Sequence, residues 1–272
     1  MSKTIGFVGG GNMARSLIGG LLSNEFDRSS IMVSDPVAQA RQYLSDHFRV
    51  SATADNSEVI ANCASVILAV KPQVMRQALE DARQALRQRR PLLISIAAGI
   101  TTDSIAEWSG GDYAIIRVMP NTPALIQKGI SALYANERVS PEQKQYTESI
   151  LSAVGKTVWV SEESQLDAVT AVSGSGPAYF FYLIEAVQAG AENLGLQPED
   201  AKLLAIETAM GSALLAGQGD DSPATLRRKV TSPGGTTEAA LNVLESAQVK
   251  DRFIQAIEAA RNRAAEMSKH VV

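Results

Sequence analysis

Short apolar runs, rich in β-branched residues, alternate with amphipathic helical patterns over residues 1–161. Most of these runs are apolar at every position, which is typical of parallel strands covered by helices on both faces. The alternation predicts βαβ units around a parallel sheet. The predicted strands are Thr4–Gly9, Ser30–Ser34, Ser65–Val70, Leu92–Ala97, Ala114–Val118, Ile130–Tyr134 and Thr157–Val160. The predicted helices are Asn12–Ser23, Pro36–His47, Ser57–Asn62, Gln73–Leu86, Thr101–Trp108 and Pro141–Ala153.

The pattern changes after Ser161, where β-rich runs give way to successive helices. Pro177, Pro198 and Pro223 each stand where the first turn of a helix needs no N–H donor. Thr236 or Thr237, followed by Glu238, predicts the start of another helix. A length of 272 residues suits about two domains. We therefore expect an α/β domain over residues 1–161 and an all-helical domain over residues 162–272.

Two stretches of the helical half, Ser164–Asn193 and Ala201–Ala216, are small or apolar almost all round. A helix without a polar face must be buried, and so short a domain offers little surface of its own to bury it against. The sequence thus predicts that this half packs against its copy in a homodimer. A monomeric sedimentation coefficient at micromolar concentration would contradict that prediction.

Composition and charge exclude several classes of function. Apolar residues make up 45% and charged residues 20%, and 25 basic against 29 acidic side chains give a net charge of −4. That balance gives no sign of a nucleic-acid-binding surface. Cys63 is the single cysteine, and His47 and His270 are the only histidines. A disulfide framework, a metal centre and a serine–histidine triad are therefore not expected.

The sequence shows no targeting signal. Its opening residues lack the pattern of a signal peptide. The longest apolar stretch, Pro91–Ile100, is well below the ~18 residues of a membrane span. We expect a cytoplasmic protein with no membrane partner.

The turn after the first predicted strand carries the strongest chemical signal. Gly9-x-Gly11-x-x-Ala14 follows a strand and opens a helix, which is the dinucleotide-binding fingerprint in its expected context. Gly9 permits the tight turn, and Gly11 lets the backbone approach a pyrophosphate beside Asn12 and Met13 at the helix N-terminus. A strand–helix turn that needs glycine only for its backbone angles is the alternative.

A cofactor selector is expected at the end of the second strand, where Ser34-Asp35-Pro36 stands. Asp35 could accept from a ribose 2′-hydroxyl and favour NAD. It could instead point away, leaving Ser34 and Arg41 to bind a 2′-phosphate. Asp35 could also be only a turn and N-cap residue. The sequence leaves these alternatives open.

Three more turns follow predicted strands, and each is marked by proline or glycine. They are Ala69-Val70-Lys71-Pro72, Ser95-Ile96-Ala97-Ala98-Gly99 and Met119-Pro120-Asn121-Thr122-Pro123. Each could be a plain turn. Because ligands collect at the carboxyl edge of a parallel sheet, three such turns favour one shared cleft that includes Ala97 and Asn121.

The helical half offers two helix starts with unobstructed N–H groups. One follows Ser173-Gly174-Ser175-Gly176, and the other follows Ser232-Pro233-Gly234-Gly235-Thr236-Thr237. Such starts suit a carboxylate, although Ser or Thr at either place could be an ordinary N-cap. Residues 157–201 hold no lysine. The general base that an alcohol dehydrogenase commonly needs is therefore missing there, whereas a protonated imine could accept hydride without one.

Together these motifs resemble pyrroline-5-carboxylate reductase over nearly the whole chain. The resemblance implies a Rossmann-type doubly wound sheet, followed by an all-α dimerisation domain whose dimers gather into larger rings. It implies reduction of 1-pyrroline-5-carboxylate to L-proline with NADP or NAD. Because the family tolerates several sequences at the end of the second strand, the choice between them stays open, with NADPH slightly favoured. It places Asn56 near the adenosine, and Val70, Lys71 and Pro72 beside the ribose and nicotinamide, with Ala69 as a further cofactor-binding residue. Ser173, Ser175 and the Ser232–Thr237 loop would hold the substrate, and the Thr237 hydroxyl would reach the ring nitrogen.

The mechanism that follows is hydride transfer from C4 of the nicotinamide to C5 of the imine. Main-chain N–H groups at the helix start would bind the carboxylate. A hydroxyl is too weak an acid to be the proton source unaided, so the proton would arrive with the substrate or through water. Two alternatives remain: a related imine or ketone reductase for another small carboxylate, and a protein that senses NAD(P) without turnover.

Overall fold

The computed structural model describes residues 4–270, with side chains described up to Ser268. The chain forms two compact units. The first comprises Met1–Ser175 together with Ala260–Val272, and the second comprises Gly176–Ala259.

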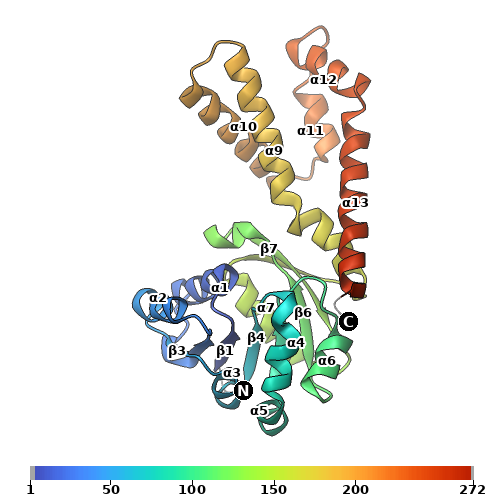
Figure 1. Cartoon of the computed structure of the whole chain (residues 1–272). Helices are drawn as coiled ribbons and strands as arrows, with labels where there is room; N and C mark the ends of the chain where they lie inside the picture. Colours follow the sequence, from blue (N-terminus) through green and yellow to red (C-terminus); the bar gives the residue numbers. More distant parts are fainter. Residues whose placement is uncertain (1–3, 271–272) are drawn as a thin grey trace. The chain divides into compact units, whose positions relative to one another are not determined.

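The first unit is built on an eight-stranded sheet in the order β3-β2-β1-β4-β5-β6-β7-β8 (Figure 1). Its first six strands run parallel, in the order of the doubly wound dinucleotide-binding fold. The strands are β1 (Ile5–Val8), β2 (Ile31–Ser34), β3 (Ser51–Thr53), β4 (Ser65–Leu68), β5 (Leu92–Ser95), β6 (Ile115–Met119), β7 (Gly129–Ala135) and β8 (Gly155–Trp159).

The prediction of an all-parallel sheet is wrong at its last two strands. β7 runs antiparallel to β6, and β8 runs parallel to β7. Residues 120–128 between β6 and β7 hold only the short helical turn η2 (Thr122–Ile126). A parallel crossover needs about a dozen residues or more, so this connection can only reverse the chain.

Helices cover both faces of the sheet. Leu17, Leu44 and Leu151 anchor α1 (Asn12–Ser23), α2 (Ala38–Phe48) and α7 (Pro141–Ser152) in one buried core. A second core holds α3 (Asn56–Asn62), α4 (Pro72–Asp81), α5 (Arg83–Arg89) and α6 (Thr102–Ser109). The predicted helix Gln73–Leu86 is thus two helices, because the backbone leaves helical geometry at Ala82.

Local signals set several helix starts as predicted. Ser140 caps α7 in a reciprocal capping box with Gln143, and Pro141 occupies the first turn. Thr101 caps α6 by accepting from the Ser104 N–H. The sequence did not predict β3, which has only three residues, or the short turn η1 (Arg28–Ser30).

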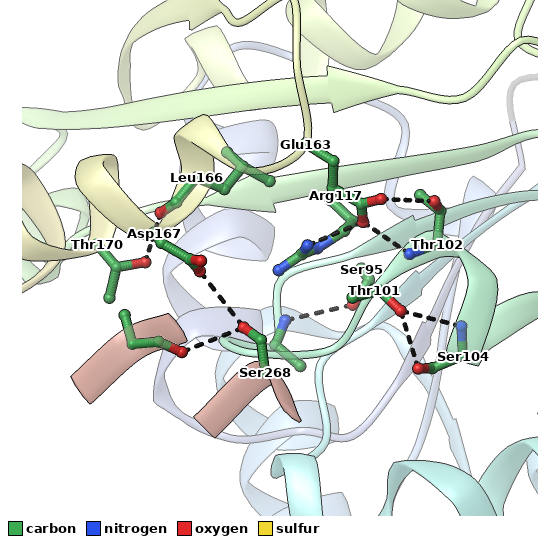
Figure 2. A network of polar contacts seen from close by, with 12 residues as sticks. Ser95, Thr101, Thr102, Ser104, Arg117, Glu163, Leu166, Asp167, Thr170 and Ser268 are labelled. Atoms are coloured by element: carbon green, nitrogen blue, oxygen red, sulfur yellow. Dashed lines mark hydrogen bonds and ion pairs between the residues drawn. The ribbon is translucent and has the colours of Figure 1, made fainter. Parts of the chain in front are cut away.

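The first unit closes with α8 (Gln165–Val169) and the π-helical turn η3 (Thr170–Gly174). The last turns of α13 (Val249–His270) return to this unit. Ala264 is buried, and the Ser268 hydroxyl donates to Asp167 Oδ1 at 3.3 Å (Figure 2).

The second unit is entirely helical over the part that the structure describes. It contains α9 (Gly176–Asn193), α10 (Pro198–Gln218), α11 (Pro223–Lys229), α12 (Thr236–Ser246) and the first half of α13. α9 packs against α10. Prolines stand in the first turns of α10 and α11, and Pro177 is the second residue of α9, as predicted. Within residues 4–270, no helix is long and apolar enough to span a bilayer.

Candidate functional site at the carboxyl edge of the sheet

The first glycine of the fingerprint is required by the fold. Gly9 has φ of +102°, and a Cβ there would come within 2.7 Å of the Ala69 carbonyl oxygen and 3.1 Å of Val70 Cγ1. Its N–H donates to the Ser34 carbonyl at 2.8 Å. The turn after β1 therefore lies directly against the turn after β4, and two of the predicted cofactor segments meet.

Gly11 is not required in the same way. Its φ of −72° and ψ of −175° suit any residue. Apart from the adjoining residues of the chain, no described atom lies within 4 Å of where its Cβ would be. Gly11 is the N-cap of α1, and no side chain of the described residues caps that helix. The N-terminus of α1, at Asn12 and Met13, therefore presents open N–H groups beside a surface kept clear of side chains.

Asp35 ties the glycine turn to β2. Its Oδ2 accepts from the Gly10 N–H at 2.9 Å, and its Oδ1 accepts from the Val37 N–H at 2.8 Å. Ser34 is fully buried, and its hydroxyl donates to the Phe7 carbonyl at 3.3 Å. The Ser34 side chain thus supports the sheet and does not face the edge.

Two arginines border this corner. Arg41 donates to the Asp35 and Pro36 carbonyls at 2.7 and 2.9 Å. Arg15 donates to the Gly10 carbonyl at 2.9 Å and lies 4.1 Å over the Tyr43 ring. Within residues 4–270 neither forms an ion pair within 4 Å. The sequence pointed to Arg41, but Arg15 was missed because its helical position gives no sign that its side chain turns back to the glycine turn.

The remaining predicted cofactor residues follow strand ends at the same edge. Lys71 is the exposed N-cap of α4, next to half-buried Val70 and Pro72. Asn56 opens α3, and Ala97 is buried just beyond β5. Asn121 Oδ1 accepts from the Ile130 N–H at 2.9 Å, so the NH₂ group is the end of this side chain that could donate to a cofactor.

The π-helical turn brings another predicted segment to this edge. Gly174 packs against Met119 Cε, and a Cβ at that position would overlap this methyl group. Ser173 Oγ donates to the Val169 carbonyl at 3.1 Å, and the Ser175 N–H donates to the Thr170 carbonyl at 2.8 Å. Because π-helical turns are rare and often occur at functional sites, the distortion marks this segment.

A polar network that the sequence did not reveal holds the segment in place (Figure 2). Buried Arg117 on β6 donates to Glu163 Oε1 at 2.8 Å. The same carboxylate accepts from the Thr102 N–H at 2.7 Å and its hydroxyl at 2.9 Å. One carboxylate thus joins β6, the start of α6 and the chain entering α8. No spacing rule predicts such a contact, because its members lie 46 and 61 residues apart.

In the second unit, the loop before α12 has the backbone expected of an anion cradle. Gly234 has φ of +70°, and the Gly235 N–H donates to the Ser232 carbonyl at 3.0 Å. Gly235 is the N-cap of α12, and within the described residues no side chain caps it. Thr236 is exposed, and Thr237 is half-buried. Glu238 Oε2 accepts from the Gly234 N–H at 2.7 Å, so a carboxylate already occupies one donor of the loop.

Comparisons with known proteins agree on one family. The model described as "Pyrroline-5-carboxylate reductase dimerisation" matches residues 163–267, and that described as "NADP oxidoreductase coenzyme F420-dependent" matches residues 4–99. The pyrroline-5-carboxylate reductases of Pseudomonas aeruginosa and Pasteurella multocida are 44% and 40% identical to the chain. Alignment with the first covers 98% of this chain and 97% of the relative, and alignment with the second covers 98% of each.

Solved structures give the same result. A pyrroline-5-carboxylate reductase from Coxiella burnetii has a TM-score of 0.93 at 43% identity, covering 98% of this chain and 99% of its own. The Plasmodium falciparum enzyme, solved with NADP bound, has a TM-score of 0.87 at 28% identity, covering 97% and 98%. The predicted fold class, a Rossmann-type sheet followed by a helical dimerisation domain, is confirmed. The chain belongs to the pyrroline-5-carboxylate reductase family of NAD(P)-dependent oxidoreductases, as its sequence motifs predict.

Proposed function

We propose that the chain reduces 1-pyrroline-5-carboxylate to L-proline with NAD(P)H, the final step of proline biosynthesis. The observation that carries the proposal concerns Gly11. The backbone conformation there does not require glycine, and the missing side chain leaves the uncapped N-terminus of α1 open. A pyrophosphate fits such a helix start, because N–H groups and the helix dipole both favour an anion there.

The proposed division of labour follows the two halves of the chain. Residues 1–161 form the dinucleotide-binding domain, and residues 162–272 form the substrate-binding and dimerisation domain. The cofactor residues are Gly9, Gly11, Asn12, Met13, Asp35, Asn56, Ala69, Val70, Lys71, Pro72, Ala97 and Asn121, with Ser34 contributing through the backbone that supports Gly9. When bound, the reduced nicotinamide supplies a hydride to C5 of the imine.

The substrate is proposed to bind at the start of α12. Main-chain N–H groups of Gly234, Gly235 and Thr236 would hold its carboxylate, and Glu238 would release the Gly234 N–H as it enters. Ser232, Ser173 and Ser175 are further proposed substrate contacts. Thr237 would direct its hydroxyl to the ring nitrogen. The protonated imine carries its own proton, so hydride addition at carbon gives the amine without a side-chain acid.

Arg15 and Arg41 support NADPH as the preferred cofactor. They place two guanidinium groups at the end of β2, where a 2′-phosphate would lie. Asp35 accepts main-chain N–H groups with both of its oxygens, so its role in the turn accounts for this residue without a ribose hydroxyl. A planar guanidinium binds phosphate in two-point geometry.

Initial velocities with NADPH and with NADH on the same imine test both parts of the proposal. We expect oxidation of the nucleotide with 1-pyrroline-5-carboxylate and a larger kcat/KM for NADPH. A higher kcat/KM on a six-membered cyclic imine would assign the chain to another imine. Tight nucleotide binding without oxidation would support a sensor and contradict the proposal.

We further propose a homodimer through the helical unit, with dimers assembling into a larger ring. Support comes from large apolar side chains left exposed on α9 and α10, such as Phe180 (65%), Phe181 (65%) and Leu204 (54%). Leaving so much apolar surface in water is costly, and a second copy would cover it. Sedimentation velocity at micromolar concentration should give at least a dimer. A small-molecule substrate, a cytoplasmic location and no nucleic-acid or membrane partner complete the proposal.

A further inference from the structure

A polar cavity lies at the amino ends of β4 and β5, at the opposite end of these strands from the dinucleotide turn. It has a volume of about 290 Å³ and opens between the end of α5 and the first turns of α7. Its floor is formed by Ser65 and Leu92, which face each other in register at the amino ends of β4 and β5. The proposed cofactor turns follow the carboxyl ends of these strands. At ~3.3 Å per residue, the two ends of each strand are about 10 Å apart.

Two adjacent arginines line the cavity, and hydrogen bonds to main-chain carbonyls hold their side chains. Arg89 Nε donates to the Cys63 carbonyl at 3.0 Å, and Arg90 Nη2 donates to the Asp112 carbonyl at 2.7 Å. A guanidinium has five N–H donors, so each group keeps donors for another partner. In the part of the chain that the structure describes, neither arginine forms an ion pair with an acidic side chain within 4 Å. Neither guanidinium group is therefore held by a carboxylate within the described residues.

The backbone at Arg90 sets where its side chain leaves the helix. Arg90 ends α5 with φ of +49° and ψ of +55°, the left-handed position that helices usually give to glycine. The Arg90 guanidinium donates to the Asp112 carbonyl, and its central carbon lies 5.5 Å from the centre of the Tyr113 ring. These two contacts orient the side chain at the rim of the cavity.

The rest of the lining adds neutral donors. Gln143 Oε1 accepts from the Ser140 N–H at 2.9 Å, so its NH₂ group is the end available to a ligand. The buried Ser65 hydroxyl donates to the Thr4 carbonyl at 3.4 Å and is hydrogen-bonded to the Tyr146 side chain, so it belongs to the floor of the cavity. Ala64 and Leu92 supply a small apolar wall. This set combines cationic and neutral donors, which is the composition that recognises an oxyanion.

We infer that this cavity binds a small anion through a carboxylate or phosphoryl group. Its volume lies at the lower end for ligand pockets, so it suits a small metabolite and excludes a second dinucleotide. The two guanidinium groups would contact the oxyanion, with the Gln143 NH₂ group as a further donor and the apolar wall against a short carbon body. The site is separate from the reaction at the carboxyl edge and does not depend on it.

Thermal unfolding with inorganic phosphate and with succinate tests this site. The titrations contain saturating NADP⁺ to fill the dinucleotide turn, and sodium chloride at matched ionic strength controls for screening. We expect a saturable rise in Tm in the wild type. The dissociation constant should rise at least tenfold in Arg89→Gln and in Arg90→Gln, and the effect should vanish in the double variant.

Arg87→Gln is the matched control, because Arg87 lies on the same helix, is exposed and does not line the cavity. It should respond as the wild type does. A larger rise with phosphate would identify a phosphoryl ligand, and a larger rise with succinate a carboxylate. The inference is overturned if neither anion exceeds chloride, or if the rise persists in the double variant, which would locate binding elsewhere.

Discussion

Replacing Gly11 by alanine should separate binding from folding. Apart from the adjoining residues of the chain, no described atom lies within 4 Å of the new methyl group, and φ of −72° suits alanine. The lower entropy of the unfolded chain should stabilise the variant by about 0.4–1 kcal/mol. Alanine is a poorer N-cap than glycine and costs about 0.5–1 kcal/mol. The two contributions nearly cancel, so the free energy of unfolding should change by no more than about 0.5 kcal/mol.

Cofactor binding should change much more. The methyl group would stand where the pyrophosphate approaches the N-terminus of α1. Loss of one charge-assisted hydrogen bond, about 1.5–3 kcal/mol, raises the dissociation constant for NADPH about 10- to 150-fold. Gly9→Ala is the contrasting variant. Its positive φ costs about 1–3 kcal/mol, before the 2.7 Å overlap with the Ala69 carbonyl is relieved.

Both quantities can be measured on the same preparations. Urea unfolding followed by the fluorescence of Trp108 and Trp159, at one fixed protein concentration, gives stability, and NADPH fluorescence gives affinity. We expect Gly11→Ala to be stable and to bind weakly, and Gly9→Ala to lose more than about 2 kcal/mol of stability. Unchanged NADPH affinity in Gly11→Ala would refute the assignment of the pyrophosphate to this helix start.

Three further predictions concern other residues. Thr237→Ala should lower kcat/KM for the imine by about 10- to 1000-fold, the scale of losing one positioned donor, while NADPH affinity stays as in the wild type; wild-type kinetics would remove Thr237 from the mechanism. Arg41→Gln should lower the ratio of kcat/KM for NADPH to that for NADH about tenfold or more, and an unchanged ratio would show that the arginine does not meet the 2′-phosphate. Burial raises the pKa of the Cys63 thiol to about 11 from 9.0, so the unfolded chain releases this proton first, and the free energy of unfolding should fall by about 1–3 kcal/mol between pH 9 and 11. Urea unfolding of Cys63→Ala should show a shallower fall over that range, and an equal slope in both proteins would contradict the effect of the buried thiol.

The elements that sequence reasoning found are those set by local signals. Continuous apolar runs mark β1, β4 and β5, and Ser140 with Gln143 marks the start of α7. What it missed depends on tertiary contacts. β3 is a strand because three residues pair with β2, and Ala82 breaks a helix whose apolar period continues across it.

The same distinction holds for the candidate site. Gly9 and Gly11 were predicted together, but only the structure shows that the fold requires one and not the other. Ser34 stands at the expected place in sequence, yet its side chain is fully buried in the sheet and its hydroxyl donates to the Phe7 carbonyl. Glu163 could not be predicted, because its partners come from two distant elements.

Transfer of deuterium from NADPH labelled at C4 of the nicotinamide tests the central claim most directly. With each C4 epimer in turn, 1-pyrroline-5-carboxylate and the purified chain, the product is analysed by mass spectrometry and NMR. One of the two epimers should give L-proline carrying a single deuterium at C5, in amounts equal to the nucleotide oxidised. Proline without deuterium from both epimers, or nucleotide that binds and stays reduced, would contradict it.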